Sequence, residues 1–311
     1  MKFITLKRVA PYLIFLAAML WATDAPFRVH LTKELSSSFI VLAEHFVSVL
    51  FMLPILFLGL KDLKQLRVKE WLAVLFIAIG GSALAAVAFT ESFHYVNPSV
   101  AILLQKLQPF IAIGLASVVL KEALGKRFWL FAGLAVVGAY LISFPNLIPQ
   151  TFPGETFNAN ITGVALALVA AFFWGASTVF GKFVLAKANF KMMTALRFVF
   201  AFIFLLVLNI SGHSFPTWSA VTNTDYLFIV IIALTSGVVA LFLYYKGLET
   251  TRASVATIAE LGFPMAAIVV NWIFLDAKLA PMQFLGVAIL LSGVYGLAEY
   301  NQAVASKEVA T

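Results

Sequence analysis

Ionisable and amide side chains stand inside stretches that are otherwise apolar enough to cross a lipid bilayer. The clearest group is Gln105, Lys106 and Gln108, within the run from Ser99 to Glu122. A charge at the bilayer centre costs about 2.5 to 3.5 kcal/mol on insertion scales, so such side chains should face a cavity or a partner. The two glutamines could hydrogen-bond a small molecule while Lys106 attracts its anionic group. The alternative is a lysine that pairs with a carboxylate only for packing.

Glu260 stands four residues before Pro264, just as Gln105 stands four residues before Pro109. A proline removes one backbone hydrogen bond and crowds the carbonyl four residues back, so both segments are expected to bend beside exposed backbone acceptors. Glu260 is therefore a candidate for carrying a coupling proton or for binding a substrate amine. The alternative is a structural ion pair with Lys106 or Arg197.

Two further pairs of polar residues are candidates for coupling transport to protons or for gating the cavity. Asp24 and Arg28 are four residues apart and can form an intrahelical ion pair, and Pro26 between them allows a bend. Glu44 and His45 are adjacent, and a histidine beside a carboxylate could relay protons. A self-neutralised structural pair and a packed histidine are the alternatives.

The remaining candidates are one cation, one peripheral acid and three aromatic residues. Arg197 suits an anion contact, because a guanidinium stays charged and can bind a carboxylate through two hydrogen bonds. Glu91 lies near the end of an apolar run, where an interfacial or gating role is expected. Trp21, Trp174 and Tyr244 are predicted to line the cavity, although aromatic residues in membrane helices also pack or sit at the interface.

These residues form no complete catalytic set. Asp24 is the one aspartate well inside an apolar run, Glu44-His45 lacks the second histidine of a zinc motif, and no P-loop is present. The chain has no cysteine, so it has no disulfide, thiol nucleophile or Cys-ligated metal. We expect neither an enzyme nor a bound metal or cofactor.

Composition shows which elements must position the polar residues. Hydrophobic types make up 62% of the 311 residues and charged types 11%, with a mean hydropathy of +1.01. A soluble domain is about half apolar and a quarter charged. The sequence therefore predicts an all-α integral membrane protein. Spans of about 20 apolar residues are expected at ten places, namely 11–30, 37–59, 70–92, 98–120, 127–144, 162–182, 191–210, 225–246, 253–275 and 281–300.

The basic residues indicate the orientation of these spans. With the N-terminus in the cytoplasm, 16 of the 21 Lys and Arg residues fall in inner segments and only Lys33 and Lys278 fall outside. This asymmetry predicts an inner (plasma) membrane protein with both termini cytoplasmic. The net charge of +7 is spread over every inner loop and forms no patch with stacking aromatics, which favours contact with lipid headgroups and argues against nucleic acid.

The chain contains an internal repeat. "SVAILLQKLQPFIAIGLASVVLKEAL" aligns with "SVATIAELGFPMAAIVVNWIFLDAKL" at an offset of 155 residues, and "AAMLWATDAPF" aligns with "AAFFWGASTVF". In the second span of each half, His45 aligns with Arg197. Five crossings per half is an odd number, so the halves 1–150 and 151–311 have inverted topology, with a polar outer loop over 145–163 joining them. Secondary transporters with such repeats bind substrate near the midplane.

The order and spacing of these motifs resemble the drug/metabolite transporter superfamily, specifically its EamA group. The similarity rests on "LWATDAPF" and "FWGASTVF" in the first helices and on the prolines followed by "LKEAL" or "LDAKL" in the fourth. The resemblance implies a ten-helix carrier that works by alternating access through a central cavity, lined largely by the first four helices of each half. Members move amino acids, nucleotide sugars, purines, vitamins or toxic organic compounds.

A cavity with both signs of charge suits a zwitterion, so we expect an amino acid or a similar small charged metabolite, with a proton as the candidate coupling ion. The second expectation is export or carriage of a nucleotide-like or amphipathic organic compound. A channel would favour a ring of like side chains, and a sensor would usually carry a soluble output domain. Gly286 and Gly293 allow close packing of the last helix, within the chain or with a second copy, so the oligomeric state stays open.

Overall fold

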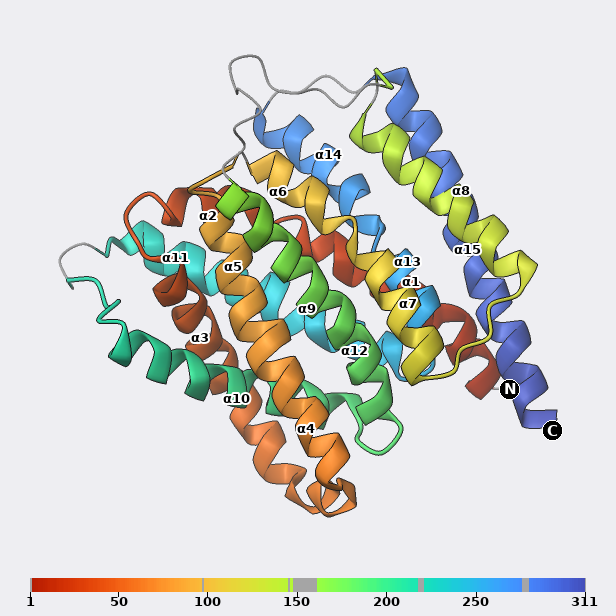
Figure 1. Ribbon diagram of the computed structural model, residues 1–311, viewed down its shortest axis with the longest axis horizontal. Coiled ribbons are helices and arrows are strands. Elements are labelled where there is room, and N and C mark those ends of the chain that lie inside the picture. Colours follow the sequence, from red (N-terminus) through yellow and green to blue (C-terminus); the bar gives the residue numbers. More distant parts are fainter. Residues whose placement is uncertain are drawn as a thin grey trace.

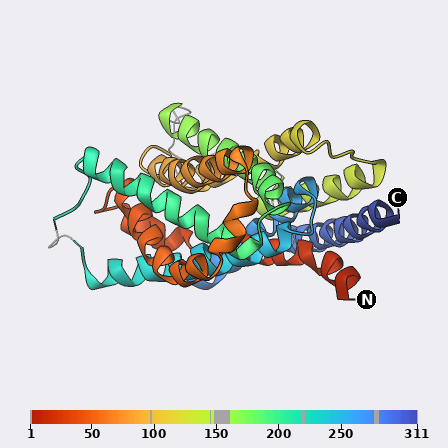
Figure 2. The ribbon, with the colours of Figure 1, turned by 90° about the horizontal axis from the view of Figure 1, so that it is seen from below.

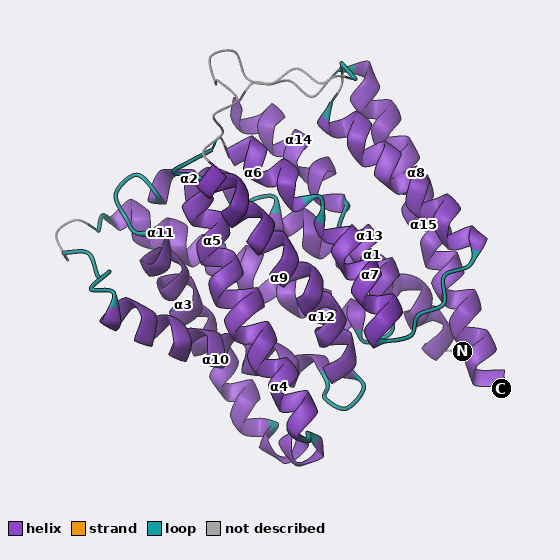
Figure 3. Ribbon diagram, viewed as in Figure 1, coloured by secondary structure: helices purple, strands orange, loops and turns teal. Residues whose placement is uncertain are grey.

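The computed structural model describes residues 2–96, 98–144, 146–147, 161–217, 221–275 and 280–310. Within these ranges every regular element is a helix (Figure 3). Nine helical segments in the described part of the chain are long and apolar enough to cross a membrane. The tenth predicted span, 98–120, is instead divided into two shorter helices. Most of the predicted joining loop, and Lys278, lie outside the described residues.

The helices of the first half follow the predicted spans closely. They are α1 (Lys2–Trp21), α2 (Ala25–Leu31), α3 (Ser37–Leu58), the short η1 (Leu60–Gln65), α4 (Val68–Phe76), η2 (Ile77–Leu84), α5 (Ala85–Ser92), α6 (Pro98–Gln105), α7 (Gln108–Val119) and α8 (Lys126–Ser143).

The second half repeats this order. Its helices are α9 (Ile161–Leu185), α10 (Phe190–Ser211), α11 (Asn223–Ile232), η4 (Ala233–Val239), α12 (Ala240–Leu248), α13 (Ala253–Ala259), α14 (Gly262–Leu275) and α15 (Pro281–Ala310).

The fourth span of each half is broken at the polar position that the sequence singled out. Lys106 and Leu107 interrupt the helix between α6 and α7, and Glu260 and Leu261 interrupt it between α13 and α14. The predicted bends are thus confirmed as breaks. Because a proline leaves the carbonyl four residues earlier without its helical donor, the helix ends there at little extra cost.

The third span of each half contains a π-helix, η2 in the first half and η4 in the second. Short π-helices occur frequently at functional sites. In η2, a Cβ on Gly80 would lie 2.6 Å from the Phe173 ring, so the wide turn presses directly on α9. The two π-helices occupy equivalent positions in the repeat.

The first span differs between the halves. In the first half it breaks between Trp21 and Ala25. Pro26 lies in the first turn of the new helix, where the backbone N–H that proline lacks would have no helical acceptor. In the second half α9 runs without interruption past Trp174. The first-helix bend that Pro26 allows therefore has no counterpart beside Trp174, because no proline interrupts that segment.

Each first helix packs within the other half. In the first half α1 lies against α12, α13, α14 and α15, whereas α9 of the second half lies against α4, α5, α6 and α7. Figure 1 shows α9 crossing the middle of the molecule, and Figure 2 shows the two groups one above the other. A space between these groups is therefore lined by both halves.

The fifth helices, α8 and α15, lie side by side along one edge (Figure 1). A Cβ on Gly293 would lie 2.6 Å from the Ala135 nitrogen, and one on Gly286 would lie 2.8 Å from the Gly138 oxygen. Such backbone approach requires glycine. The close packing expected of Gly286 and Gly293 is thus made within the chain.

Candidate functional site

A cavity of about 190 Å³ lies between the two groups of helices. Twelve of the thirteen site residues expected from the sequence line it, and Glu91, at the end of α5, does not. Those that do are Trp21, Asp24, Arg28, Glu44, His45, Gln105, Lys106, Gln108, Trp174, Arg197, Tyr244 and Glu260.

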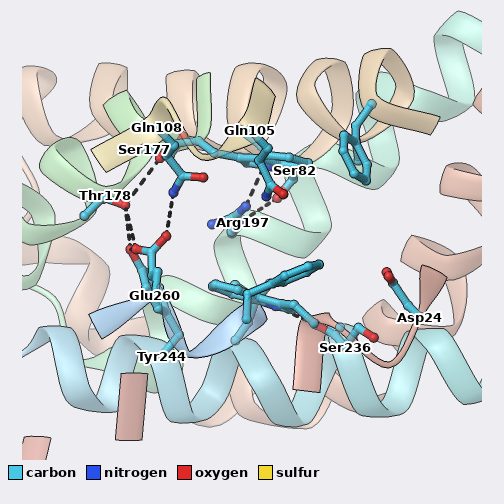
Figure 4. A pocket seen from close by; sticks show the side chains of 18 of the residues that line it. Asp24, Ser82, Gln105, Gln108, Ser177, Thr178, Arg197, Ser236, Tyr244 and Glu260 are labelled. Carbon is cyan, nitrogen blue, oxygen red and sulfur yellow. Dashed lines mark hydrogen bonds between the residues drawn. The ribbon is translucent and has the colours of Figure 1, made fainter. Parts of the chain in front are cut away.

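Glu260 lies where α13 ends and accepts hydrogen bonds from both halves (Figure 4). Gln108 Nε2 donates to its Oε2 at 2.5 Å and the Tyr244 hydroxyl donates to its Oε1 at 3.0 Å. Thr178 Oγ1 is 3.3 Å from the same Oε1 and 2.6 Å from the Tyr244 hydroxyl. Charged acceptors form the stronger hydrogen bonds. The carboxylate therefore ties α7 to three segments of the second half.

Lys106 is not paired with Glu260. Its Nζ lies 3.8 Å from the centre of the Phe263 ring, and within the described residues no carboxylate oxygen comes within 4.0 Å of it. A cation over an aromatic face is stabilised by the ring quadrupole. The proposed packing pair is thus absent here, and the ammonium stays available to the cavity.

Arg197 is anchored to the π-helix η2 and to α12. Its Nε donates to Ser82 Oγ, its Nη2 donates to the Gly81 carbonyl at 3.1 Å, and its Nη1 donates to the Tyr245 hydroxyl at 2.8 Å. Arg197 is buried, with 7% of its surface exposed. All three partners are neutral, so the guanidinium keeps its full charge beside the cavity.

Arg28 holds two carboxylates at the other end of the cavity. Its Nη2 donates to Asp24 Oδ2 at 3.1 Å and to Glu44 Oε2 at 3.1 Å, and its Nη1 lies 3.0 Å from Glu44 Oε1. Nη1 also donates to Thr90 Oγ1 at 2.9 Å. The expected Asp24–Arg28 pair is present, and Glu44 joins it. Figure 4 places Asp24 at the far end from Glu260.

His45 does not pair with Glu44. Its Nδ1 lies 2.8 Å from the Val41 carbonyl oxygen, which can only accept, so Nδ1 carries the proton and a neutral ring leaves Nε2 as an acceptor. The ring also lies edge-on to Phe198, with centroids 5.5 Å apart. The direct Glu44–His45 relay is therefore not formed, because Arg28 engages the carboxylate.

Aromatic rings form part of the cavity wall. Trp21 and Tyr244 lie with ring centroids 5.2 Å apart, and Trp174 packs edge-on against Phe89 at 5.2 Å. Trp21 is fixed by a hydrogen bond from Nε1 to the Ser236 carbonyl at 3.0 Å. Rigid aromatic faces of this kind suit a flat ligand.

Several polar residues of the wall were missed by sequence reasoning. Ser177 and Thr257 each have a buried hydroxyl without a hydrogen-bond partner in the described part of the chain. The amide oxygen of Gln105, a residue that the sequence did predict, is buried there without a partner as well. Buried polar groups are normally paired. Ser177 and Thr178 follow Trp174 by three and four residues on one helix face, which is the sequence signal that could have found them.

Comparison with protein-family models identifies the family of the chain. The model of the EamA-like transporter family matches residues 9–144 and 161–298, one copy for each half. The chain belongs to the EamA-like transporter family. This EamA-like transporter is therefore an integral membrane protein made of two repeats and is not an enzyme, and the two matched segments coincide with the two five-span halves.

Relatives of the EamA-like transporter carry transport names. It is 32% identical over 301 residues to the riboflavin transporter ImpX of Fusobacterium nucleatum subsp. nucleatum, covering 93% of this chain and 97% of that one. It is 22% identical over 244 residues to the uncharacterized transporter YetK of Bacillus subtilis, covering 78% and 73%. A protein of known crystal structure shares its fold at a TM-score of 0.74 and 14% identity, covering 95% and 98%.

Proposed function

We propose that this EamA-like transporter carries riboflavin, or a close flavin relative, through the cavity between its two halves. The main support is the relative named a riboflavin transporter, which is similar over nearly its whole length. The cavity suits such a molecule, because riboflavin joins a flat tricyclic ring to a flexible chain of hydroxyl groups. Trp21 and Tyr244 offer faces for the ring, and the unpartnered hydroxyls of Ser177 and Thr257 offer partners for the chain.

The charges of the cavity favour a neutral solute. Three acids, Asp24, Glu44 and Glu260, face it together with three bases. The bases are Arg28, Lys106 and Arg197. The formal charges of these six groups cancel, so a flavin without a phosphate is preferred to a phosphorylated one.

An amino acid, expected from the mixture of charges, is the second candidate. Lys106 and Arg197 are free of carboxylates in the described residues and could hold a substrate carboxylate, while Glu260 could receive its ammonium group. A flavin instead belongs to the nucleotide-like class that was the second expectation. The name of the relative favours the flavin.

Alternating access is the proposed mechanism. Glu122, just after α7, accepts from the backbone nitrogens of Ala253 and Ser254 at 2.8 and 3.1 Å, which joins the fourth spans of the two halves at the side proposed to be cytoplasmic. Release of such a contact would allow the fourth spans to move at their breaks. Glu260 is the proposed site for a coupling proton, because protonation would disturb its hydrogen bonds to both halves.

Purified protein is expected to bind riboflavin and to quench its fluorescence, because the ring stacks on indole and phenol faces. In proteoliposomes preloaded with unlabelled riboflavin, uptake of labelled riboflavin should accelerate, which distinguishes a carrier from a channel. Trp21→Leu should weaken binding about 5- to 100-fold, since stacking contributes about 1 to 3 kcal/mol. Ser292→Ala on α15, where the exposed hydroxyl bonds its own helix, is the control. Counterflow with amino acids and none with riboflavin would overturn the proposal.

Both termini are proposed to face the cytoplasm of the inner (plasma) membrane, on the strength of the basic inner loops. The cysteine-free chain permits single-cysteine labelling. A membrane-impermeant maleimide should label Thr217→Cys, at an exposed position after α10, in intact cells. It should label Lys64→Cys, exposed in η1, only after the membrane is permeabilised. The reverse pattern would invert the assigned topology.

A further inference from the structure

Each of the two π-helices holds a cavity side chain through a backbone carbonyl. Gly81 in η2 accepts from Arg197 Nη2 at 3.1 Å, and Ser236 in η4 accepts from Trp21 Nε1 at 3.0 Å. Gly81 and Ser236 are 155 residues apart, which is the offset of the repeat. Equivalent backbone carbonyls of the two halves thus hold the Arg197 guanidinium and the Trp21 indole in place.

The guanidinium of Arg197 keeps donors for a ligand. It has five N–H groups, and Ser82 Oγ, the Gly81 carbonyl and the Tyr245 hydroxyl take one each. One N–H on each terminal nitrogen is left over. Arg197 lines the cavity, and Figure 4 shows it between Glu260 and Asp24. The two terminal nitrogens of a guanidinium can together bind two adjacent acceptors.

An unpartnered hydroxyl lies against Gly81, the residue whose carbonyl accepts from Arg197 Nη2. Ser177 Oγ has no hydrogen-bond partner in the described residues and sits directly against the position that a Cβ on Gly81 would occupy. In riboflavin the N1 and O2 acceptors are adjacent, and the hydroxyl chain attached at N10 begins beside N1. A guanidinium with a hydroxyl nearby therefore matches this edge of the ring system better than the opposite N5 edge.

On the basis of the proposed flavin transport, we propose that Ser82 is a positioning residue, which with the Gly81 carbonyl orients Arg197 so that its two free N–H groups bind N1 and O2 of the flavin. Ser82 fixes Nε, and the carbonyl fixes Nη2, so the plane of the guanidinium cannot turn about its long axis. Without the hydroxyl, only the Gly81 carbonyl and the Tyr245 hydroxyl would hold the guanidinium, and its plane could tilt so that one flavin acceptor is missed.

The test compares binding of riboflavin with that of 1-deazariboflavin, which has a C–H in place of N1. Competition against radiolabelled riboflavin should show that wild-type protein prefers riboflavin about tenfold, the value of one charge-assisted hydrogen bond. In Ser82→Ala this preference should fall toward one. Arg197→Lys, which keeps the charge but loses the two terminal guanidinium nitrogens, should show the same loss. Ser92→Ala, a buried serine of the same span that bonds the Phe89 carbonyl, should keep the wild-type preference.

Other outcomes are equally decisive. If Ser82→Ala weakens both ligands by the same factor, the serine is merely structural and the inference is overturned. If the preference that is lost concerns 5-deazariboflavin instead, the assignment of Arg197 to the N1 edge is wrong. Wild-type protein that binds no riboflavin would overturn the proposed function together with this inference, whereas riboflavin binding with an unchanged preference in Ser82→Ala would overturn the inference alone.

Discussion

Arg28→Met is expected to lower the free energy of unfolding by about 3 to 5 kcal/mol, because it removes the partner of two buried carboxylates. Asp24 and Glu44 would lose hydrogen bonds of 3.1 Å each, and Thr90 would lose its charged donor. Two like charges would then share one end of the cavity. Thermal unfolding of the detergent-purified protein, followed by size-exclusion chromatography, measures this loss.

A compensated variant shows whether the three groups act as a unit. Combining Arg28→Met with Asp24→Asn and Glu44→Gln removes the uncompensated charges and should recover much of the stability. Lys187→Met is the matched control, since its pair with Glu70 at 2.6 Å involves a half-exposed lysine and contributes less than about 1 kcal/mol. Equal stability of Arg28→Met and wild type would show that the ion cluster has no structural role.

The second large effect is expected on transport. Glu260→Gln keeps the size of the side chain but removes the charge and places an amide group among donors, opposite Gln108 Nε2. Uptake of riboflavin driven by a proton gradient should fall to about the rate seen without a gradient, because the amide of glutamine cannot carry the coupling proton. Exchange of riboflavin across vesicles without a gradient should fall much less, because that reaction needs no change in protonation.

Lys106→Met separates substrate binding from coupling. This variant keeps the Glu260 hydrogen bonds and removes the cation over Phe263. It should weaken riboflavin binding while the ratio of gradient-driven uptake to exchange stays that of wild type. A Glu260→Gln protein that accumulates riboflavin against its gradient as well as wild type would show that the proton uses another group. Unchanged exchange in both variants would remove both residues from the transport site.

The sequence allowed the general architecture to be predicted because the bilayer imposes strong rules. A span needs about 20 apolar residues, so its position is evident from composition. A charge within a span is costly unless it faces a cavity, so Arg28, Glu44, Arg197 and Glu260 were expected around one space and do line it. Their roles in transport stay predictions.

Pairings and local geometry could not be predicted in the same way. Glu44 was assigned to His45, its neighbour in sequence, whereas the fold brings Arg28 to it from another helix. The π-turn at Gly81 has no distinctive composition, because it depends on how closely the helix meets α9. Ser177 and Thr257 were overlooked because small hydroxyl residues are common in membrane helices and most bond their own backbone.

The break in the first helix of only one half has an energetic consequence for the transport cycle. If two inverted halves were identical, exchanging their conformations would convert one facing of the carrier into the other, and the two facings would have equal free energy. The two halves of this chain are not identical. At Asp24 and Pro26 the first span of the first half divides into α1 and α2, whereas α9 in the second half continues unbroken. Arg28 adds an ion cluster in one half alone. In the proposed alternating-access cycle, we therefore expect the two orientations of the empty carrier to differ in free energy, so that one of them is the resting orientation.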